Sequence, residues 1–186
     1  MPELPEVETI ARDLNGGVAG ATIVDARVFR RDVLRSCTPA SLRAATAGAR
    51  IERAWRRAKH VVLDLSNGHR ITVSPRFTGA LLIEPGAWNS GRGDYTVLVF
   101  PLGDGRTLRY RDVRRLGTVT LHDAPAFTAW EATIGPEPLE PAFSTATLSE
   151  ANGKAMPVPK SVGGATITLL PLALKPGAYT VKWQAV

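Results

Sequence analysis

The apolar residues of the N-terminal segment recur three and four positions apart, which is the spacing of one face of a helix. Pro5 falls where the first turn of a helix tolerates proline. The glycine-rich stretch Asn15-Gly16-Gly17 predicts the end of this helix. The residues that form the apolar face are Leu4, Val7, Ile10, Ala11 and Leu14.

After this helix the pattern changes to short apolar runs of the strand type. Thr22 to Phe29 is rich in β-branched residues and predicts a strand, and Asn67-Gly68 and Asp104-Gly105 predict hairpin turns. Thr38-Pro39 predicts the start of a short helix that ends near Ala47. Further strands are expected at about 50–56, 60–65, 69–74, 79–83, 95–101, 106–111 and 117–121, and a third helix near 124–133. Many short strands with few helices predict a mainly β protein with flanking helices (α+β), built as a sandwich or flattened barrel.

The last 40 or so residues contain further strand and turn signals. Asn152-Gly153 and Lys175-Pro176-Gly177 predict turns, and Ala165 to Leu170 predicts a strand. The final strand alternates, with Tyr179, Val181 and Trp183 expected on one face.

Composition places the 186 residues among globular proteins, with 44% hydrophobic residues. No apolar run approaches the roughly 20 residues that span a bilayer, and the acidic, proline-containing N-terminus does not resemble a signal peptide. We therefore expect a cytoplasmic protein with no membrane partner. The single cysteine, Cys37, excludes an internal disulfide and a cysteine-based zinc site. A net charge of +6 indicates a polyanionic partner.

The kind of basic residue changes along the chain. Residues 1–143 contain eighteen arginines and one lysine, whereas residues 144–186 contain four lysines and no arginine. Chance in a short tail is one explanation. The other is that two segments of different origin meet here, after the proline-rich stretch 135–141. The domains predicted on this basis are 1–143 and 144–186.

The N-terminus carries candidate chemistry. If Met1 is removed, Pro2 has a free secondary amine, and an α-amino group with a pKa near 8 is partly unprotonated at neutral pH. Such an amine can attack the anomeric carbon of a sugar and form an iminium intermediate. Glu3 stands beside it and Glu6 follows one helical turn later. Helix capping by these carboxylates is the alternative.

Five spaced motifs in residues 1–143 resemble bacterial formamidopyrimidine-DNA glycosylases, the Fpg/Nei family of base-excision repair enzymes. The N-terminal string Met1–Thr9 is similar to the start of these enzymes. The family's lysine-bearing turn, Thr/Ser-Gly turn, Asp-x-Arg-Arg-Phe-Gly loop and domain-ending segment are matched by Arg57–Leu65, Thr78–Leu82, Arg109–Gly117 and Ile134–Leu139.

The resemblance implies a fold, a reaction and a catalytic set. The fold is the β-sandwich of the family's N-terminal domain, and the reaction is glycosylase and apurinic-site lyase chemistry on oxidised purines in damaged DNA. Pro2 is the implied Schiff-base former, Glu3 the general acid that opens the sugar ring, and Glu6 a support for this network. Lys59 is the implied contact to the phosphates beside the lesion, with an ordinary surface lysine as the alternative.

The remaining implied residues contact DNA. Arg115 holds the strand backbone and Arg114 enters the space left by the flipped nucleotide, while His60 stands next to Lys59 in the same turn. A solvated arginine pair is the alternative for Arg114 and Arg115. Phe77 and Leu116 replace a methionine and a phenylalanine of the family; both are apolar, so they can act as wedges or belong to the core.

The tail resembles a different family. Leu148–Lys154 and Leu172–Trp183 are similar to late strands of CopC-like copper-resistance domains, so we expect Ig-like strands that extend the sandwich. The copper ligands of that family are not matched, and the helix-two-turn-helix and four-cysteine zinc finger of the glycosylases are not encoded here. No cofactor is therefore expected, and DNA binding is expected to be weak or activity lost. A non-catalytic chimeric β-protein is the alternative function.

Overall fold

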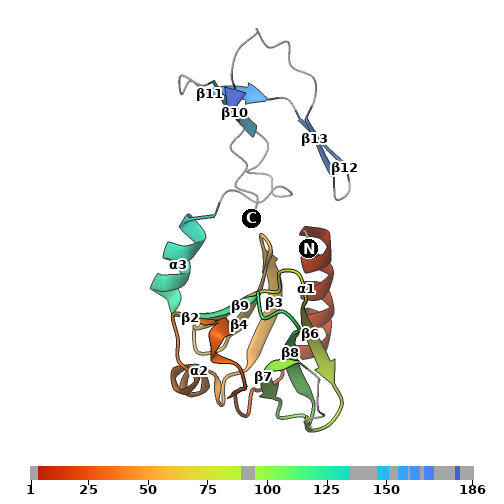
Figure 1. The fold of residues 1–186 in the computed structure, drawn as a ribbon, viewed down its shortest axis with the longest axis vertical. Coiled ribbons are helices and arrows are strands. Elements are labelled where there is room, and N and C mark those ends of the chain that lie inside the picture. Colours follow the sequence, from red (N-terminus) through yellow and green to blue (C-terminus); the bar gives the residue numbers. More distant parts are fainter. Residues whose placement is uncertain are drawn as a thin grey trace. The chain divides into compact units, whose positions relative to one another are not determined.

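The protein is described here by a computed structural model, which covers residues 4–88 and 95–134 and, beyond them, the backbone of five short strands between residues 146 and 180. The chain divides into two units, Met1–Glu131 and Ala132–Val186 (Figure 1). Each unit is described by itself.

A five-stranded sheet forms one layer of the first unit. Its order is β2 (Leu34–Arg35), β9 (Thr118–His122), β5 (Arg70–Ser74), β4 (His60–Leu65) and β3 (Ile51–Arg57). Only β2 and β9 run parallel, and the other neighbours are antiparallel. Gly68, with φ of +83°, completes the predicted Asn67-Gly68 turn between β4 and β5.

A four-stranded sheet forms the second layer. Its order is β1 (Arg27–Val28), β7 (Thr96–Pro101), β8 (Thr107–Asp112) and β6 (Gly79–Glu84), and all pairs are antiparallel. The predicted turn Asp104-Gly105 joins β7 to β8, with φ of +86° at Gly105.

Both sheets contribute to one hydrophobic core. Alternate residues of the five-stranded sheet point into it, because side chains in a strand alternate between the two faces. The fully or almost fully buried members include Val61, Leu63, Ile71 and Val73 from that sheet and Leu98, Phe100, Leu108 and Tyr110 from the other. The predicted mainly β architecture with a few helices is confirmed.

Helix α1 (Leu4–Val18) packs Val7, Leu14 and Val18 into this core and lies against β3, β4 and β6. It continues past the predicted glycine stop. A Cβ on Gly17 would lie 2.2 Å from Cδ1 of Ile83 in β6, so this glycine permits close packing instead of ending the helix. The change to a left-handed backbone comes at Gly20, where φ is +85°.

Two further short elements follow as the chain leaves β1. Helix α2 (Pro39–Thr46) begins with a capping box between Thr38 and Ser41, as the Thr38-Pro39 signal predicts. The 3₁₀ turn η1 (Arg31–Val33) precedes this helix and leads into β2. The sequence pattern predicted neither η1 nor β2. Among the described helices, none is long and apolar enough to cross a membrane.

The predicted strand over 22–29 was wrong for most of its length. Thr22 and Ile23 form isolated bridges, to Arg50 and Leu102, and only Arg27 and Val28 form a strand. The segment passes from the edge of one sheet to the edge of the other. Its backbone therefore forms hydrogen bonds first with one sheet and then with the other, and no regular strand pairing forms.

Helix α3 (Ala124–Ala132) covers the outer face of the five-stranded sheet, away from α1 (Figure 1). Phe127 is its buried residue, with its ring 6.2 Å from Trp55 of β3 and 5.8 Å from His122 of β9. Nε2 of His122 is 3.0 Å from the Thr72 hydroxyl. Trp130 brings its ring to 5.2 Å from that of His60.

The described strands of the second unit form two small antiparallel sheets. β10 (Ala146–Glu150) pairs with β11 (Ala155–Val158) and with β14 (Tyr179–Thr180). β12 (Lys160–Gly163) pairs with β13 (Thr166–Leu169), which lies within the strand predicted at 165–170. The predicted turns at 152–153 and 175–177 lie outside the described residues.

The histidines under α3 make stability depend on pH. Burial lowers the pKa of His60 to about 4, with the charge of Arg76 adding to the effect, and burial also lowers the pKa of His122. An unfolded chain, in which histidine titrates near 6.5, therefore binds more protons than the folded chain between about pH 4 and 6.5. The stability contributed by neutral His60 is complete above this window and is lost as the pH falls through it.

We expect the free energy of unfolding to fall by about 1–3 kcal/mol between pH 7 and pH 4 through His60. Urea denaturation of wild type and His60→Gln at several pH values measures the difference. His69→Gln is the matched control, because it removes another histidine ring, at the residue just before β5. Equal pH profiles for wild type and His60→Gln would contradict this assignment.

Candidate functional site

Strand register brings three loops to one end of the five-stranded sheet. Arg57 pairs with His60 across the β3–β4 turn, and Val61 pairs with Val73 near the end of β5. Ser74, the last residue of β5, pairs with Thr118, the first residue of β9. The β3–β4 turn, the segment 75–78 and the loop 113–117 therefore share this end, although they are up to 60 residues apart in sequence.

The β3–β4 turn presents Lys59 from a fixed backbone. Ala58 is fully buried and has φ of +64°, an uncommon conformation for alanine that a tight two-residue turn imposes. Arg56, with a side chain only 6% exposed, donates from Nη1 to the carbonyl oxygen of Ala58 at 3.1 Å. Lys59 itself is partly exposed beside His60.

Two ion pairs secure the strand that carries this turn. Arg56 Nε lies 2.8 Å from Oε2 of Glu8 on α1, and Arg57 Nε lies 3.4 Å from Oε1 of Glu131 on α3. Partial burial raises the pKa of Glu8, but the hydrogen bonds from Arg56 and Arg12 outweigh it and hold that pKa below its usual value. The turn is therefore held from both faces of β3.

The direction of α1 brings its N-terminus toward the same end. The Asn15 side chain accepts a hydrogen bond from the backbone N–H of Ala54 at 2.9 Å, and Glu8, two turns earlier, reaches Arg56. Successive turns toward the start of α1 thus approach the Lys59 turn. Glu6 is exposed in the first turn of the helix, whereas Pro2 and Glu3 lie outside the described residues.

The carboxylate of Asp112 joins the other two loops. The residue is 1% exposed at the end of β8. Oδ1 accepts hydrogen bonds from the Thr78 hydroxyl at 2.5 Å and from the N–H of Arg114 at 3.2 Å, and Oδ2 accepts from the N–H of Gly117 at 2.8 Å. The buried Tyr110 hydroxyl lies 3.3 Å from Oδ2 and completes the set. One side chain therefore fixes both ends of loop 113–117 to segment 75–78.

Two glycines make this arrangement possible. A Cβ on Gly117 would lie 1.9 Å from the Tyr110 hydroxyl and 2.6 Å from the Ser74 carbonyl oxygen. A Cβ on Gly79 would lie 2.3 Å from the backbone oxygen of Pro75, whose carbonyl accepts the N–H of Gly79 at 2.9 Å. Backbone atoms cannot move aside easily, so both positions require glycine.

Apolar side chains project from the joined loops into solvent. Phe77 is 49% exposed, Val113 42% and Leu116 40%. The Arg114 guanidinium lies 5.3 Å from the centre of the Phe77 ring, a cation–π contact. The alternative placement of Phe77 and Leu116 in the core is therefore wrong. Exposed apolar residues beside arginine are typical of a surface that binds a partner.

Arg115 has an ion pair on the same surface. Its Nη1 lies 3.1 Å from Oδ2 of Asp32 in η1, and both side chains are 52% exposed. Arg115 also has φ of +53°, so the loop turns sharply at this residue. Arg114 and Arg115 are thus exposed arginines with one defined side-chain contact each.

The sequence interpretation quoted Thr78 and Asp112 within motifs but assigned them no role, and it did not single out Asp32. No local signal marked the first two, because Asp112 stands among arginines and Thr78 precedes its strand, and their burial depends on packing between distant segments. Asp32 likewise offered no signal, since its contact depends on how η1 lies beside a loop that follows it by about 80 residues.

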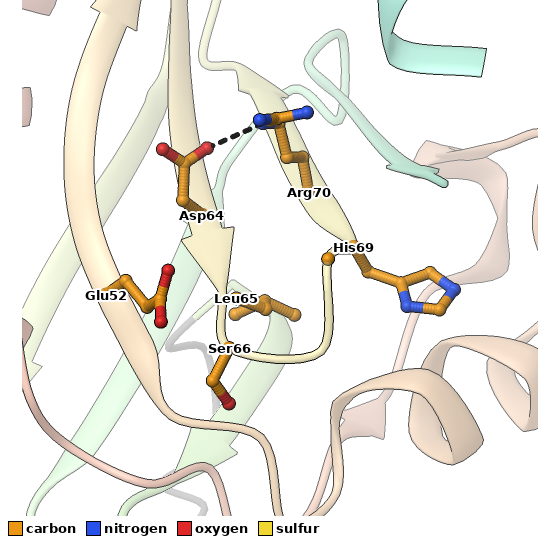
Figure 2. A pocket seen from close by; sticks show the side chains of 7 residues that line it. Glu52, Asp64, Leu65, Ser66, His69 and Arg70 are labelled. Atoms are coloured by element: carbon orange, nitrogen blue, oxygen red, sulfur yellow. Dashed lines mark hydrogen bonds and ion pairs between the residues drawn. The ribbon is translucent and has the colours of Figure 1, made fainter. Parts of the chain in front are cut away.

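A separate open pocket of about 220 Å³ lies at the opposite end of the sheet and contains none of the predicted site residues. It is lined by Glu52 and by residues of the β4–β5 hairpin. Figure 2 shows Asp64 turned toward Arg70, whose Nε is 2.9 Å away, while the His69 ring points away from both.

The described part of the chain has no grouping of side chains typical of a zinc site. Cys37 is the one cysteine of the sequence, and burial raises the pKa of its thiol, which opposes the thiolate form that binds metal. Within residues 4–88 and 95–134, no three His, Cys, Asp or Glu side chains are grouped to hold an ion.

Replacing the Asp112 carboxylate should destabilise the fold, because buried donors lose a charged acceptor. We expect Asp112→Asn to lower the free energy of unfolding by about 2–4 kcal/mol and Thr78→Val by about 1–2 kcal/mol. The double variant should lose less than the sum of the two. Urea denaturation measures all three. Asp104→Asn, in an exposed ion pair with Arg106, is the control and should change little. Full additivity would show that Thr78 and Asp112 do not act as one network.

Comparison with known proteins places this site in a family context. The family model described as "Formamidopyrimidine-DNA glycosylase N-terminal domain" matches residues 1–119. The formamidopyrimidine-DNA glycosylase of Chloroflexus aggregans is 38% identical over 151 residues, which cover 81% of this chain and 54% of that protein. That of Caulobacter vibrioides is 35% identical over 174 residues, covering 87% of this chain and 60% of the relative.

Solved structures agree with the sequence matches. A complex of Lactococcus lactis Fpg with DNA that contains an abasic site has a TM-score of 0.67 and 25% identity, and the match covers 74% of this chain and 50% of that one. A complex of the same Lactococcus protein with Fapy-dG-containing DNA has a TM-score of 0.67 and 25% identity over 73% of this chain and 51% of that one. The chain spans about half the length of the relatives it matches. By the family model and by these relatives, it belongs to the formamidopyrimidine-DNA glycosylase family.

Proposed function

We propose that this chain carries the catalytic half of a DNA glycosylase and apurinic-site lyase that acts on oxidised purines. The observation that carries the proposal is the end of the five-stranded sheet. There a lysine turn and two loops joined by Asp112 present exposed Phe77 and Leu116 beside Arg114. The Lactococcus relatives were solved with abasic-site DNA and with Fapy-dG DNA, which supports damaged DNA as the partner.

Pro2 is the proposed nucleophile. Once Met1 is removed, the lone pair of its secondary amine forms a bond to C1′ of the damaged nucleotide, and the bond from C1′ to the base breaks as the base leaves with a proton. Glu3 protonates the ring oxygen of the sugar, which opens the ring and leaves an iminium at C1′. Loss of a C2′ proton then expels the 3′ phosphate by β-elimination. The direction of α1 toward the Lys59 turn supports this placement of the N-terminus.

The remaining residues hold the DNA in this proposal. Lys59 contacts the phosphates next to the lesion, with His60 beside it, and Glu6 supports the network from the first turn of α1. Arg115 holds the strand backbone, while Arg114, Phe77 and Leu116 fill the space of the flipped nucleotide. The exposure of Phe77 and Leu116 supports this role, because the side chains can reach a bound duplex without unfolding the loops.

The strength of DNA binding and the origin of the tail are further parts of the proposal. DNA affinity rises with the number of phosphates contacted, so these 186 residues, tested by themselves, should bind less tightly than a full-length relative. The tail from 144 is proposed to be a CopC-like, Ig-like strand fragment, and the antiparallel strands β10 to β14 are compatible with this. The alternative function, a non-catalytic chimeric β-protein, predicts no covalent chemistry at Pro2.

Borohydride trapping separates the two functions. Wild-type protein, with loss of Met1 verified by intact mass, should form a covalent adduct with abasic-site DNA when the iminium is reduced. Pro2→Gly should lose at least about 90% of the adduct, because a primary amine replaces the positioned secondary amine. Pro5→Ala, a proline change that leaves the N-terminal amine intact, is the matched control. An equal adduct yield from wild type and Pro2→Gly would refute the mechanism.

Glu3 should matter more for a nucleotide that still carries its damaged base than for an abasic site. We expect Glu3→Gln to reduce conversion of an oxidised-purine nucleotide to the trapped adduct about 100-fold or more, as loss of a general acid does. The effect on trapping to abasic DNA should be smaller, because an abasic sugar is already partly in its ring-opened aldehyde form. Glu8→Gln, a nearby carboxylate that pairs with Arg56, is the control for lost charge on α1. Equal losses in both assays would assign Glu3 a structural role instead.

A further inference from the structure

The short turn η1 lies beside the loop that carries Arg114 and Arg115. β2 runs parallel to β9, with Leu34 opposite Val119, so the residues that precede these two strands lie alongside each other. The ion pair between Asp32 and Arg115, at 3.1 Å, closes this contact. The topology thus brings the segment around residue 31 to the functional end of the sheet.

Burial and backbone bonds hold η1 in place. Val33 is fully buried and Leu34 is 8% exposed. The N–H groups of Phe29 and Arg30 donate to the carbonyl oxygen of Val97, at 2.8 and 3.3 Å. Arg30 and Arg31 are therefore exposed side chains on a defined backbone rather than on a free loop.

Positive charge at this end is less neutralised than elsewhere in the described part of the chain. Arg30, Arg31, Arg76 and Arg114 have no acidic partner among the described residues; the Arg30 guanidinium donates to the carbonyl of Phe29 instead. At the opposite end of the sheets, arginines pair with carboxylates. Those pairs are Arg50 with Glu52, Arg53 and Arg70 with Asp64, and Arg106 with Asp104.

We propose that Arg30 and Arg31 form a second phosphate-binding patch, which contacts duplex DNA flanking the damaged nucleotide, and that Asp32 is an internal counter-ion of Arg115 that a DNA phosphate displaces. The inference rests on the proposed function and extends its DNA surface to η1. Both side chains of the Asp32–Arg115 ion pair are about half exposed. Ion pairs this exposed contribute little free energy, so a DNA phosphate can replace the carboxylate.

This arrangement predicts opposite effects for neighbouring residues. Removing Asp32 frees Arg115 and removes a negative charge that repels DNA, so affinity should rise. Removing Arg30 and Arg31 eliminates phosphate contacts, so affinity and its dependence on salt should both fall. Phosphate contacts carry no sequence or damage information, so the effects should be alike on undamaged and abasic duplexes.

The test is fluorescence anisotropy of the 186-residue protein with a labelled short duplex, either undamaged or containing a tetrahydrofuran abasic analogue, between about 50 and 200 mM salt. Asp32→Asn should bind both duplexes about 3- to 10-fold more tightly. Arg30→Gln/Arg31→Gln should bind both about 10-fold more weakly, with the slope of log K against log salt smaller by about 1 to 2.

The hairpin turn at the far end of the four-stranded sheet supplies matched controls. Asp104→Asn and Arg106→Gln make the same charge changes in an exposed ion pair, and both should bind like wild type. Denaturation midpoints of all variants should equal that of wild type, since every changed side chain is exposed.

The possible failures are distinguishable. If wild type binds DNA and the η1 variants behave like the Asp104 and Arg106 controls, the patch is overturned, while the Pro2 trapping result stands independently. A decrease in affinity for Asp32→Asn would overturn the counter-ion role. If wild type shows no salt-dependent binding to either duplex, the proposed function falls and the patch with it.

Discussion

The buried carboxylate of Asp112 is the interaction on which the arrangement of the candidate functional surface depends. It stands where β8 of one sheet ends and the chain crosses to β9 of the other, and it accepts hydrogen bonds from Thr78, Arg114 and Gly117. A carboxylate removed from water needs such donors, because an unpaired buried charge costs several kcal/mol. Satisfying that requirement fixes two loops relative to each other. The exposed Phe77 and Leu116 are consequently presented from a fixed backbone, which a partner can contact without first ordering a loop.

Strand register distributes the chemistry of the first unit. The β3–β4 turn, segment 75–78, loop 113–117 and η1 all reach one end of the sheets, and α1 approaches the same end. Helix α3 covers the outer face of the five-stranded sheet. Its Phe127 and Trp130 pack against Trp55, His60 and His122. His60 therefore serves the packing of α3 as well as standing next to Lys59, which explains why burial lowers its pKa.

Charge is unevenly placed rather than simply abundant. The net charge of +6 suggests a polyanion partner for the whole chain, but many of the arginines away from the functional end are paired with carboxylates. The unpaired guanidinium groups of the described residues lie around η1 and the Asp112-linked loops. Local excess of this kind, rather than net charge, sets where a phosphate backbone is attracted, because screening limits each charge to about 10 Å at 0.1 M salt.

Local sequence determined much of the secondary structure of this protein. β4, β5, β6, β8, β9, α2 and α3 follow from apolar spacing, the Thr38-Pro39 cap and the turns at Gly68 and Gly105, since these signals act within a few residues. Spaced motifs also identified the family, and they predicted Lys59, Phe77, Arg114, Arg115 and Leu116 as site residues. The helix end predicted at Gly16-Gly17 was wrong, because Gly17 packs closely against Ile83, 66 residues later. The strand predicted at 22–29 was wrong for most of its length, because its pairing partners belong to two sheets. Only the tertiary structure decided that Asp112 joins two loops, that Phe77 and Leu116 are exposed and that Asp32 pairs with Arg115. Each of these depends on register and packing between distant segments, which no local pattern encodes.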